Sequence, residues 1–168
     1  IQFCNKPLIY WTIKNCIDSN CDSIWVSSDS IEILQISKEL GVNIIKRPKN
    51  ISDDLSTSES AWSHAIDFIE SKNIKIDLII APQVTSPLRD KLDISNAINI
   101  FIRNKYDSLF SCCKIEDFFI WNKMPNGKMI SENYDYKSRK RRQDINSQFV
   151  ENGSFYIFKP HILKNLNN

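Results

Sequence analysis

The sequence predicts an α/β fold, in which helices cover a mainly parallel sheet. Over residues 1–113, short apolar runs with the length of buried strands alternate with segments whose apolar residues recur at helical spacing. With 168 residues, of which 42% are hydrophobic, the chain is also long enough to form one domain with a sizeable core.

Two helices and two strands are expected in the N-terminal part of the chain. Asn5 can cap the first helix with Pro7 in its first turn, where a missing N–H costs nothing. Strands are expected over residues 23–27 and 43–46, and Gly41 is expected to end the helix between them. The apolar residues expected on the buried sides of these helices are Ile9, Ile13, Cys16, Ile17, Ile33, Ile36 and Leu40.

Two more helices and two more strands follow in the same alternation. Residues 56–59 supply caps for a third helix, and Asp90 is expected to cap the fourth. Strands are expected over residues 74–81 and 108–113. The apolar faces of the two helices are Trp62, Ala65, Ile66 and Ile69 in the third and Ile94, Ala97, Ile98, Phe101 and Ile102 in the fourth.

The pattern changes after Lys114. Apolar residues on both sides of the turn signal Pro125-Asn126-Gly127 predict a hairpin, and a strand resumes over residues 154–158. We therefore expect a single domain over residues 1–168, with an excursion from the sheet over about residues 115–150 that returns to it.

Composition excludes several classes of function. The 22 basic and 20 acidic side chains nearly balance, so no global field favours nucleic acid or a membrane, and no apolar run approaches the roughly 20 residues that span a bilayer. Five cysteines without a CxxC pair argue against a disulfide framework or a zinc site and favour reduced thiols in a cytoplasmic protein. His64 and His161 lack partners at metal or nucleophile spacing, so no metal ligand is nominated.

The segment from Pro82 to Arg89 is the first candidate site. Ligands of open α/β sheets lie at the carboxyl ends of strands, and this segment is a stiff polar tip at such an end, with two prolines. Gln83 offers both donor and acceptor groups, which suit a sugar or a carboxylate, beside the hydroxyl of Ser86 and the guanidinium of Arg89. An ordinary strand-to-helix turn explains the same residues equally well.

The loop that follows residues 43–46 is a second candidate. Arg47 can pair with a phosphate, and the hydroxyl of Ser58 with the N–H groups of a helix start can bind an anion, although a capped loop is the simpler interpretation. The basic run over residues 137–142 repels itself unless an anion lies near, while a solvated face or a short nucleic-acid patch would also explain it.

Together these segments resemble the acylneuraminate cytidylyltransferases, also called CMP-sialic acid synthetases, which couple CTP to a nonulosonic acid. The matching stretches occur in the family's order over nearly the whole chain. They are Lys6-Pro7-Leu8-Ile9-Tyr10-Trp11-Thr12-Ile13, Val26-Ser27-Ser28-Asp29, Arg47-Pro48 leading to Asp54, Gln83-Val84-Thr85-Ser86-Pro87-Leu88-Arg89, Arg141-Arg142-Gln143 and Glu151-Asn152-Gly153-Ser154-Phe155-Tyr156-Ile157.

The resemblance implies a three-layer, Rossmann-like nucleotidyltransferase fold and transfer of CMP from CTP to sialic, legionaminic or pseudaminic acid, with release of pyrophosphate. Magnesium would bridge the phosphate oxygens. Family members are typically homodimers in which the excursion packs against the partner subunit, so that Arg142 would reach the neighbouring active site. The site residues that follow are Gln83 and Arg142 as catalytic and Arg47, Ser58, Gln83, Ser86, Arg89, Asn152 and Tyr156 as substrate-binding.

Within that set, Arg47 and Ser58 would face the nucleotide, and Gln83 would hold the carboxylate and anomeric hydroxyl of the sugar acid. Tyr156 would line the sugar pocket, on a strand shaped by the residue pair Asn152-Gly153.

The chain departs from the family pattern in three ways. It starts just after the family's glycine-bearing Ser-Lys loop, which grips the CTP phosphates, it stops at Asn168 before the acidic metal-binding segment, and it has Val84 where proline is usual. A truncated, non-catalytic remnant that binds nucleotide weakly or only dimerises is therefore an alternative. An enzyme for Kdo is another, although such enzymes have an acidic ligand at the place of Gln83.

Overall fold

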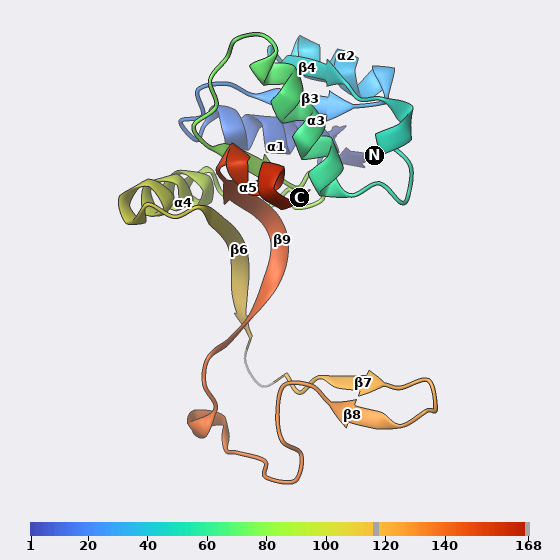
Figure 1. Ribbon diagram of the computed structural model, residues 1–168, viewed down its shortest axis with the longest axis vertical. Coiled ribbons are helices and arrows are strands. Elements are labelled where there is room, and N and C mark those ends of the chain that lie inside the picture. The colour runs from blue at the N-terminus through green and yellow to red at the C-terminus, as the bar shows by residue number, and fades with distance from the viewer. Residues whose placement is uncertain (116–117, 167–168) are drawn as a thin grey trace. The chain divides into compact units, whose positions relative to one another are not determined.

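The computed structural model describes residues 1–115 and 118–166, without the side chains of Lys91, Arg142, Asn165 and Leu166. The chain divides into two compact units, one formed by Ile1–Ser111 with Gly153–Asn168 and the other by Cys112–Asn152 (Figure 1). The first unit contains the helices and the larger sheet, and the second contains a hairpin.

The helices are α1 (Leu8–Ile17), α2 (Ile31–Glu39), α3 (Ser58–Glu70), α4 (Lys91–Asn104) and α5 (Pro160–Leu166), with short 3-10 turns η1 (Lys49–Ile51) and η2 (Arg142–Asp144). The strands are β1 (Gln2–Phe3), β2 (Lys6–Pro7), β3 (Trp25–Ser28), β4 (Asn43–Lys46), β5 (Ile79–Pro82), β6 (Ser108–Ile115), β7 (Trp121–Lys123), β8 (Met129–Ser131) and β9 (Gln148–Phe158). Alternating helices and strands make this a mixed α/β protein, as predicted.

The first turn of the chain differs from the prediction. Strands β1 and β2 form an antiparallel hairpin whose two loop residues, Cys4 and Asn5, have φ values of 48° and 59°. Two consecutive positive φ values are typical of the tight turn that joins such strands, and asparagine tolerates them well. Asn5 therefore does not cap α1, which starts after Pro7 without a side-chain cap, so this prediction is wrong.

Strands β3 and β4 pair in parallel, with Trp25 opposite Asn43, and α2 packs against both. Gly41 ends α2 as predicted, because it adopts a φ of 79° and its N–H donates to the carbonyl of Lys38 at 3.0 Å. The buried residues of α2 are Leu34 and Ser37, whereas Ile33, expected on the buried face, is 37% exposed.

The three-stranded sheet has the order β5-β9-β6, and β9 runs antiparallel to β5 with Ala81 opposite Tyr156. The expectation of a mainly parallel sheet therefore needs correction. A parallel return requires a crossover, usually helical, but a hairpin and a 3-10 turn separate β6 from β9. The hydroxyl of Ser111 donates to the carbonyl of Phe155, and Nδ2 of Asn152 donates to Sγ of Cys113. Strand β9 therefore runs back alongside β6.

Strand β5 is shorter than predicted and begins at Ile79 instead of residue 74. Its partner explains the difference. Phe158, opposite Ile79, is the last residue of β9, and α5 begins at Pro160, which has no N–H to continue the ladder.

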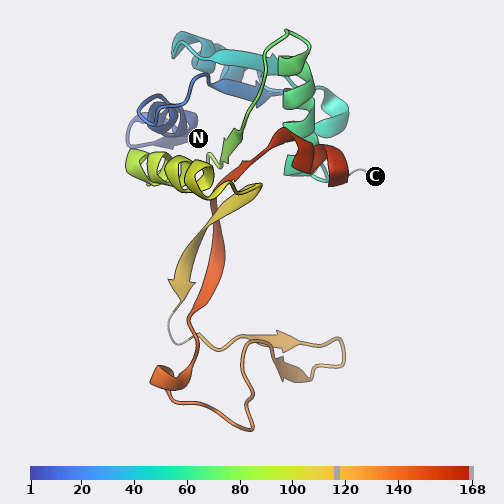
Figure 2. The ribbon, with the colours of Figure 1, turned by 60° about the vertical axis from the view of Figure 1, so that its left-hand side comes forward.

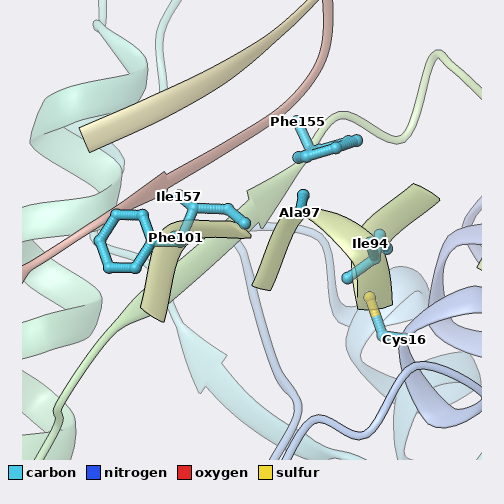
Figure 3. Packing of buried hydrophobic residues seen from close by; sticks show 6 residues of the cluster. All are labelled: Cys16, Ile94, Ala97, Phe101, Phe155 and Ile157. Carbon is cyan, nitrogen blue, oxygen red and sulfur yellow. The ribbon is translucent and has the colours of Figure 1, made fainter. Parts of the chain in front are cut away.

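Side chains alternate between two faces of β5 and β9. Phe155 and Ile157 pack with Cys16 of α1 and with Ile94, Ala97 and Phe101 of α4 (Figure 3). On the other face, Phe158 and Ala81 pack with Ile66 of α3 and Leu163 of α5, and both ribbon views show α3 beside α5 (Figures 1 and 2). The two-residue periodicity of the strands thus places helices on both sides of the sheet.

Besides Ile33, two more residues expected in the core are exposed, Ile17 by 55% and Ile102 by 59%. Ile17 is the last residue of α1 and Ile102 lies in the last turn of α4, next to the polar ends of both helices. The helical spacing correctly predicted that both residues lie in helices. It could not predict their burial, because a periodic pattern does not show how far the neighbouring sheet extends.

The unit Cys112–Asn152 contains the predicted hairpin, with β7 antiparallel to β8 and Trp121 opposite Ser131. Gly127 closes the turn with a φ of 80°, and its N–H donates to the carbonyl of Met124 at 2.8 Å. The ring of Tyr134 lies 4.3 Å from that of Phe119 and 5.8 Å from that of Trp121. Within the part of the chain that is described, no helix combines the length and the apolar character that a membrane crossing requires.

Candidate substrate-binding site at the end of strand β5

The polar tip begins where β5 ends and is tied to β9. The N–H of Gln83 donates to the carbonyl of Ser154 at 2.9 Å, which extends the β5–β9 ladder by one bond. The N–H of Ser86 then donates back to the carbonyl of Gln83 at 3.2 Å, closing a tight turn. Both backbone groups of Gln83 are thereby held, while its side chain is exposed.

Arg89 lies beneath this turn with 7% of its surface exposed. Its Nε donates to Oγ of Ser154 at 2.9 Å, and its Nη2 donates to the carbonyl oxygens of Gln83, at 2.9 Å, and of Ser154. Desolvation by burial lowers the pKa of Arg89, although a guanidinium remains protonated in proteins. These contacts of the side chain are internal, and substrate binding by Arg89 stays a prediction.

The carboxamide of Gln83 lies against Gly153, where the backbone has a φ of +63°. A Cβ at this glycine would lie 3.0 Å from Oε1 and 3.5 Å from Cδ of Gln83. On the other side, the hydroxyl of Thr85 donates to the same Oε1 at 3.5 Å. Glycine is therefore needed at position 153 both for its backbone conformation and for the space that the amide occupies.

Tyr156 lies two residues further along β9 than Ser154, opposite Ala81 of β5. Its ring packs against Trp62 of α3 with 5.5 Å between ring centroids, so a helix and a strand fix its plane together. Asn152 belongs to the other compact unit, where its Nδ2 donates to Sγ of Cys113 at 3.2 Å.

Arg47 and Ser58 lie on the other sheet and the helix after it. Arg47 follows β4 and is half-buried, its Nε donates to Oγ of Ser52 at 3.1 Å, and its Nη2 lies 4.0 Å from Oδ1 of Asp29. The cap of α3 is Thr57, whose Oγ1 accepts from the N–H of Ser60 at 3.2 Å, and Ser58 is the exposed first residue of that helix. An acidic neighbour at Arg47 reduces the net positive charge available to a phosphate.

The side chain of Arg142 lies outside the described residues, although its backbone starts η2. Its neighbours in the basic run have partners that the sequence analysis missed. Nε of Arg141 donates to Asp144 at 2.7 Å, and the guanidinium of Arg139 lies 4.3 Å from the ring centre of Phe119. The acidic residue at i+3 from Arg141 was the available signal for the first of these contacts.

A separate cavity of about 620 Å³ lies along α3 and was not foreseen. Thr57, Ser60, His64 and Asp67 line it from one side of the helix, and Leu163 of α5 lines it as well. These residues recur three to four positions apart, so the helical period alone would have grouped them.

Magnesium prefers carboxylate and water oxygens, and a protein site for it usually needs several such ligands. The described residues gather no group of three histidine, cysteine, aspartate or glutamate side chains that could hold a metal ion. We therefore assign no reaction step to a metal held by these residues.

Comparison with known proteins adds four findings. A family model described as cytidylyltransferase matches residues 1–166. N-acylneuraminate cytidylyltransferase A from Danio rerio is 32% identical over 162 residues, covering 94% of this chain and 36% of that protein. Pseudaminic acid cytidylyltransferase from Campylobacter jejuni subsp. jejuni serotype O:23/36 (strain 81-176) is 33% identical over 179 residues, covering 96% of this chain and 76% of that protein.

The chain therefore spans 36% of the length of the fish relative and 76% of that of the bacterial one. Among solved structures, CMP:2-keto-3-deoxy-manno-octonic acid synthetase complexed with CTP superposes with a TM-score of 0.71 at 13% identity. That match covers 99% of this chain and 69% of the other, and at this identity it establishes the fold alone.

Proposed function

Since this chain belongs to the cytidylyltransferase family, we propose that it transfers CMP from CTP to a nonulosonic acid, such as sialic, legionaminic or pseudaminic acid, with release of pyrophosphate. One observation carries the proposal. Two relatives named for different acids of this class, N-acylneuraminate and pseudaminic acid, both align with more than nine-tenths of the chain. This supports the class of acid and leaves the individual acid to experiment.

In the proposed reaction, the anomeric hydroxyl oxygen of the sugar acid forms a bond to the α-phosphorus of CTP. The bond from that phosphorus to the oxygen it shares with the β-phosphate breaks, pyrophosphate leaves with the electron pair, and the hydroxyl proton passes to solvent. Positioning of the two substrates and neutralisation of the developing phosphate charge are the main contributions open to the protein. Magnesium bound together with CTP is part of the proposal and would supply further neutralisation.

The tip of β5 is the proposed sugar side of the site. The exposed carboxamide of Gln83 would bind the carboxylate and anomeric hydroxyl of the acid, with Ser86 beside it and Tyr156 lining the pocket. Gln83 is neutral, so it can donate to a carboxylate without the repulsion that an acidic side chain would add. Support for this role comes from the tie between Gln83 and β9, which holds the amide in place.

Arg47 and Ser58 are the proposed nucleotide contacts. Arg47 is anchored by Ser52 at a strand end, and Ser58 opens α3, where the positive end of the helix dipole favours a phosphate. The protein is proposed to be a homodimer in which Arg142 of one subunit reaches the active site of the other. Its proposed location is the cytoplasm.

The test is release of pyrophosphate from CTP, measured with the protein in its full encoded length. N-acetylneuraminic, legionaminic and pseudaminic acids and Kdo are supplied in separate reactions, with a reaction lacking any acid as the blank. We expect turnover with at least one nonulosonic acid and less with Kdo. No turnover with any of the acids would contradict the proposal, and absence of CTP binding by calorimetry would then favour a non-catalytic remnant.

A matched pair of variants ties the activity to the site. Gln83→Ala is expected to raise the KM for the sugar acid about tenfold or more, because it removes a hydrogen bond to a charged group. Gln35→Ala changes an exposed glutamine on α2 and is expected to leave the kinetics unchanged. Equal kinetics for the two variants would remove Gln83 from the site.

A further inference from the structure

The burial of Arg89 calls for an explanation, because removing a guanidinium from water is unfavourable unless hydrogen bonds compensate. Its hydrogen-bond acceptors are two backbone carbonyls and one hydroxyl, all neutral groups. Nε and Nη2 of the guanidinium are bonded between the ends of two strands, and Nη1 is buried without a hydrogen-bond partner among the described residues. The contacts indicate a role inside the protein.

Those acceptors belong to two separate segments, one of them 65 residues from Arg89 in the chain. Ser154 contributes both its hydroxyl and its carbonyl, and Gln83 contributes its carbonyl. The carbonyl of Ser154 also accepts the N–H of Gln83. Arg89 thus closes a ring of hydrogen bonds in which the backbone of Gln83 has little freedom to move relative to β9.

This ring of hydrogen bonds also affects the position of the Gln83 side chain. Gly153 precedes Ser154, and its bare Cα leaves the space in which the carboxamide rests, with Oε1 where a Cβ would approach to 3.0 Å. Oε1 accepts from the hydroxyl of Thr85 at 3.5 Å, so Nε2 is the group of this amide that can donate to a ligand. A small shift of the Gln83 backbone against Gly153 would turn or displace that donor.

We propose that Arg89 is a positioning residue, which locks the tip of β5 to β9 so that the Gln83 carboxamide meets the sugar acid in one fixed orientation. The inference rests on the proposed function and deepens it. Arg89 then affects the sugar acid through Gln83 and has no effect of its own on CTP. The competing interpretation is that Arg89 itself contacts the anionic substrate.

Arg89→Lys separates these interpretations, since lysine keeps the positive charge but loses the planar fork that reaches two acceptors at once. We expect the KM for the sugar acid to rise about tenfold, the loss expected for a charged hydrogen bond, with the KM for CTP unchanged. Arg103→Lys, the same substitution at an exposed position of α4, is the control and should leave both constants unchanged. An equal rise in the KM for CTP would overturn the proposal.

A double-mutant cycle with Gln83→Ala is the decisive measurement. If Arg89 acts through Gln83, Arg89→Lys changes the sugar-acid KM less than about twofold once the carboxamide is gone, within the limits of additivity. If Arg89 binds the substrate itself, the two effects multiply, and the proposal is wrong.

A second readout needs no activity at all. Amide hydrogen exchange followed by NMR should show faster exchange at Gln83 in Arg89→Lys, with the amide of Ile157 in the sheet interior still protected. Ser154→Ala, which removes one acceptor and little volume, should give a smaller change of the same kind and serves if Arg89→Lys fails to fold. Unchanged exchange at Gln83 in both variants would contradict the positioning role.

The two readouts also keep the proposals apart. A wild-type protein that turns over none of the acids would refute the proposed function, while the exchange of Gln83 would still report whether Arg89 holds the tip.

Discussion

Cys16 in the last turn of α1 and Cys21, four residues beyond the end of that helix, have pKa shifts in opposite directions. Cys16 is buried against α4, and the hydrogen bond with Cys21 together with its burial raises its pKa. The same bond lowers the pKa of Cys21, because a donor stabilises the thiolate, although partial burial opposes this effect. Cys21 is thus the more nucleophilic member of the pair.

We expect iodoacetamide at neutral pH to modify Cys21 before Cys16, as followed by mass spectrometry of the separate peptides. Cys16→Ala removes the donor, so the pKa of Cys21 returns upward and its alkylation slows at fixed pH. Cys16→Ser keeps a donor and should largely preserve the rate. Faster alkylation of Cys21 in Cys16→Ala than in Cys16→Ser would show that burial and not the hydrogen bond governs this thiol.

Arg89 illustrates what single residues reveal from the sequence. The sequence shows that Arg89 lies in a polar tip after a strand. It does not show that the side chain of Arg89 points into the protein. That direction depends on Ser154, which is 65 residues away and becomes a neighbour only when β9 pairs with β5. For the same reason, the contact between Gly153 and Gln83 was not predictable.

At the level of elements, α4 begins with a capping box. Asp90 accepts from the N–H of Leu92 at 2.7 Å, and Asp93 accepts from the N–H of Asp90 at 3.1 Å, which together form a capping box. Three core residues, Ile94, Ala97 and Phe101, lie on this helix, so its first turn fixes the register in which they meet β9.

Asp90→Ala is expected to lower the free energy of unfolding by about 1 kcal/mol, the usual cost of losing an N-cap. Asp67→Ala is the matched control, an exposed aspartate inside α3 where alanine is the better helix former, and it should not destabilise the protein. Urea unfolding of both variants measures the difference. Equal free energies of unfolding for the two variants would mean that the capping box contributes nothing.

Elements held by local bonds were predicted best. Asp90, Gly41 and the turn at Gly127 act within a few residues of chain, and all three are confirmed. Strand ends depend on partners distant in sequence, so β5 was predicted five residues too long at its start. The prediction that Asn5 caps α1 was wrong for a related reason. Helix caps and tight turns both favour asparagine, and only the pairing of β1 with β2 decides between them.

At the scale of the whole molecule, the buried hydrophobic residues that the structure describes all belong to one compact unit. Both hydrophobic clusters consist of residues from Ile1–Ser111 and Gly153–Asn168, whereas Cys112–Asn152 is organised around contacts between exposed and half-buried aromatic rings. The core of the first unit therefore does not need the second for its packing.

We expect the first unit to fold when residues 114–151 are replaced by Asn-Gly, since Cys113 and Asn152 already face each other and this dipeptide favours a two-residue hairpin. The shortened protein should keep its helical circular dichroism and unfold in one cooperative transition on heating. The hairpin joined by Ala-Ala, a poor sequence for such a turn, is the control and should be less stable. Loss of the cooperative transition in the Asn-Gly protein would show that the second unit is needed for folding.

By itself, the sequence determined the α/β class, the order of the helices, the local caps and turns, and a set of motifs typical of one family. These features depend on periodicity and on groups a few residues apart, which the sequence contains directly. The tertiary structure decided the antiparallel pairing of β9 with β5, the bounds of β5 and the burial of the Arg89 side chain. Each of these depends on which distant strands pair, and only the folded chain brings Gln83, Arg89 and Ser154 within hydrogen-bonding distance.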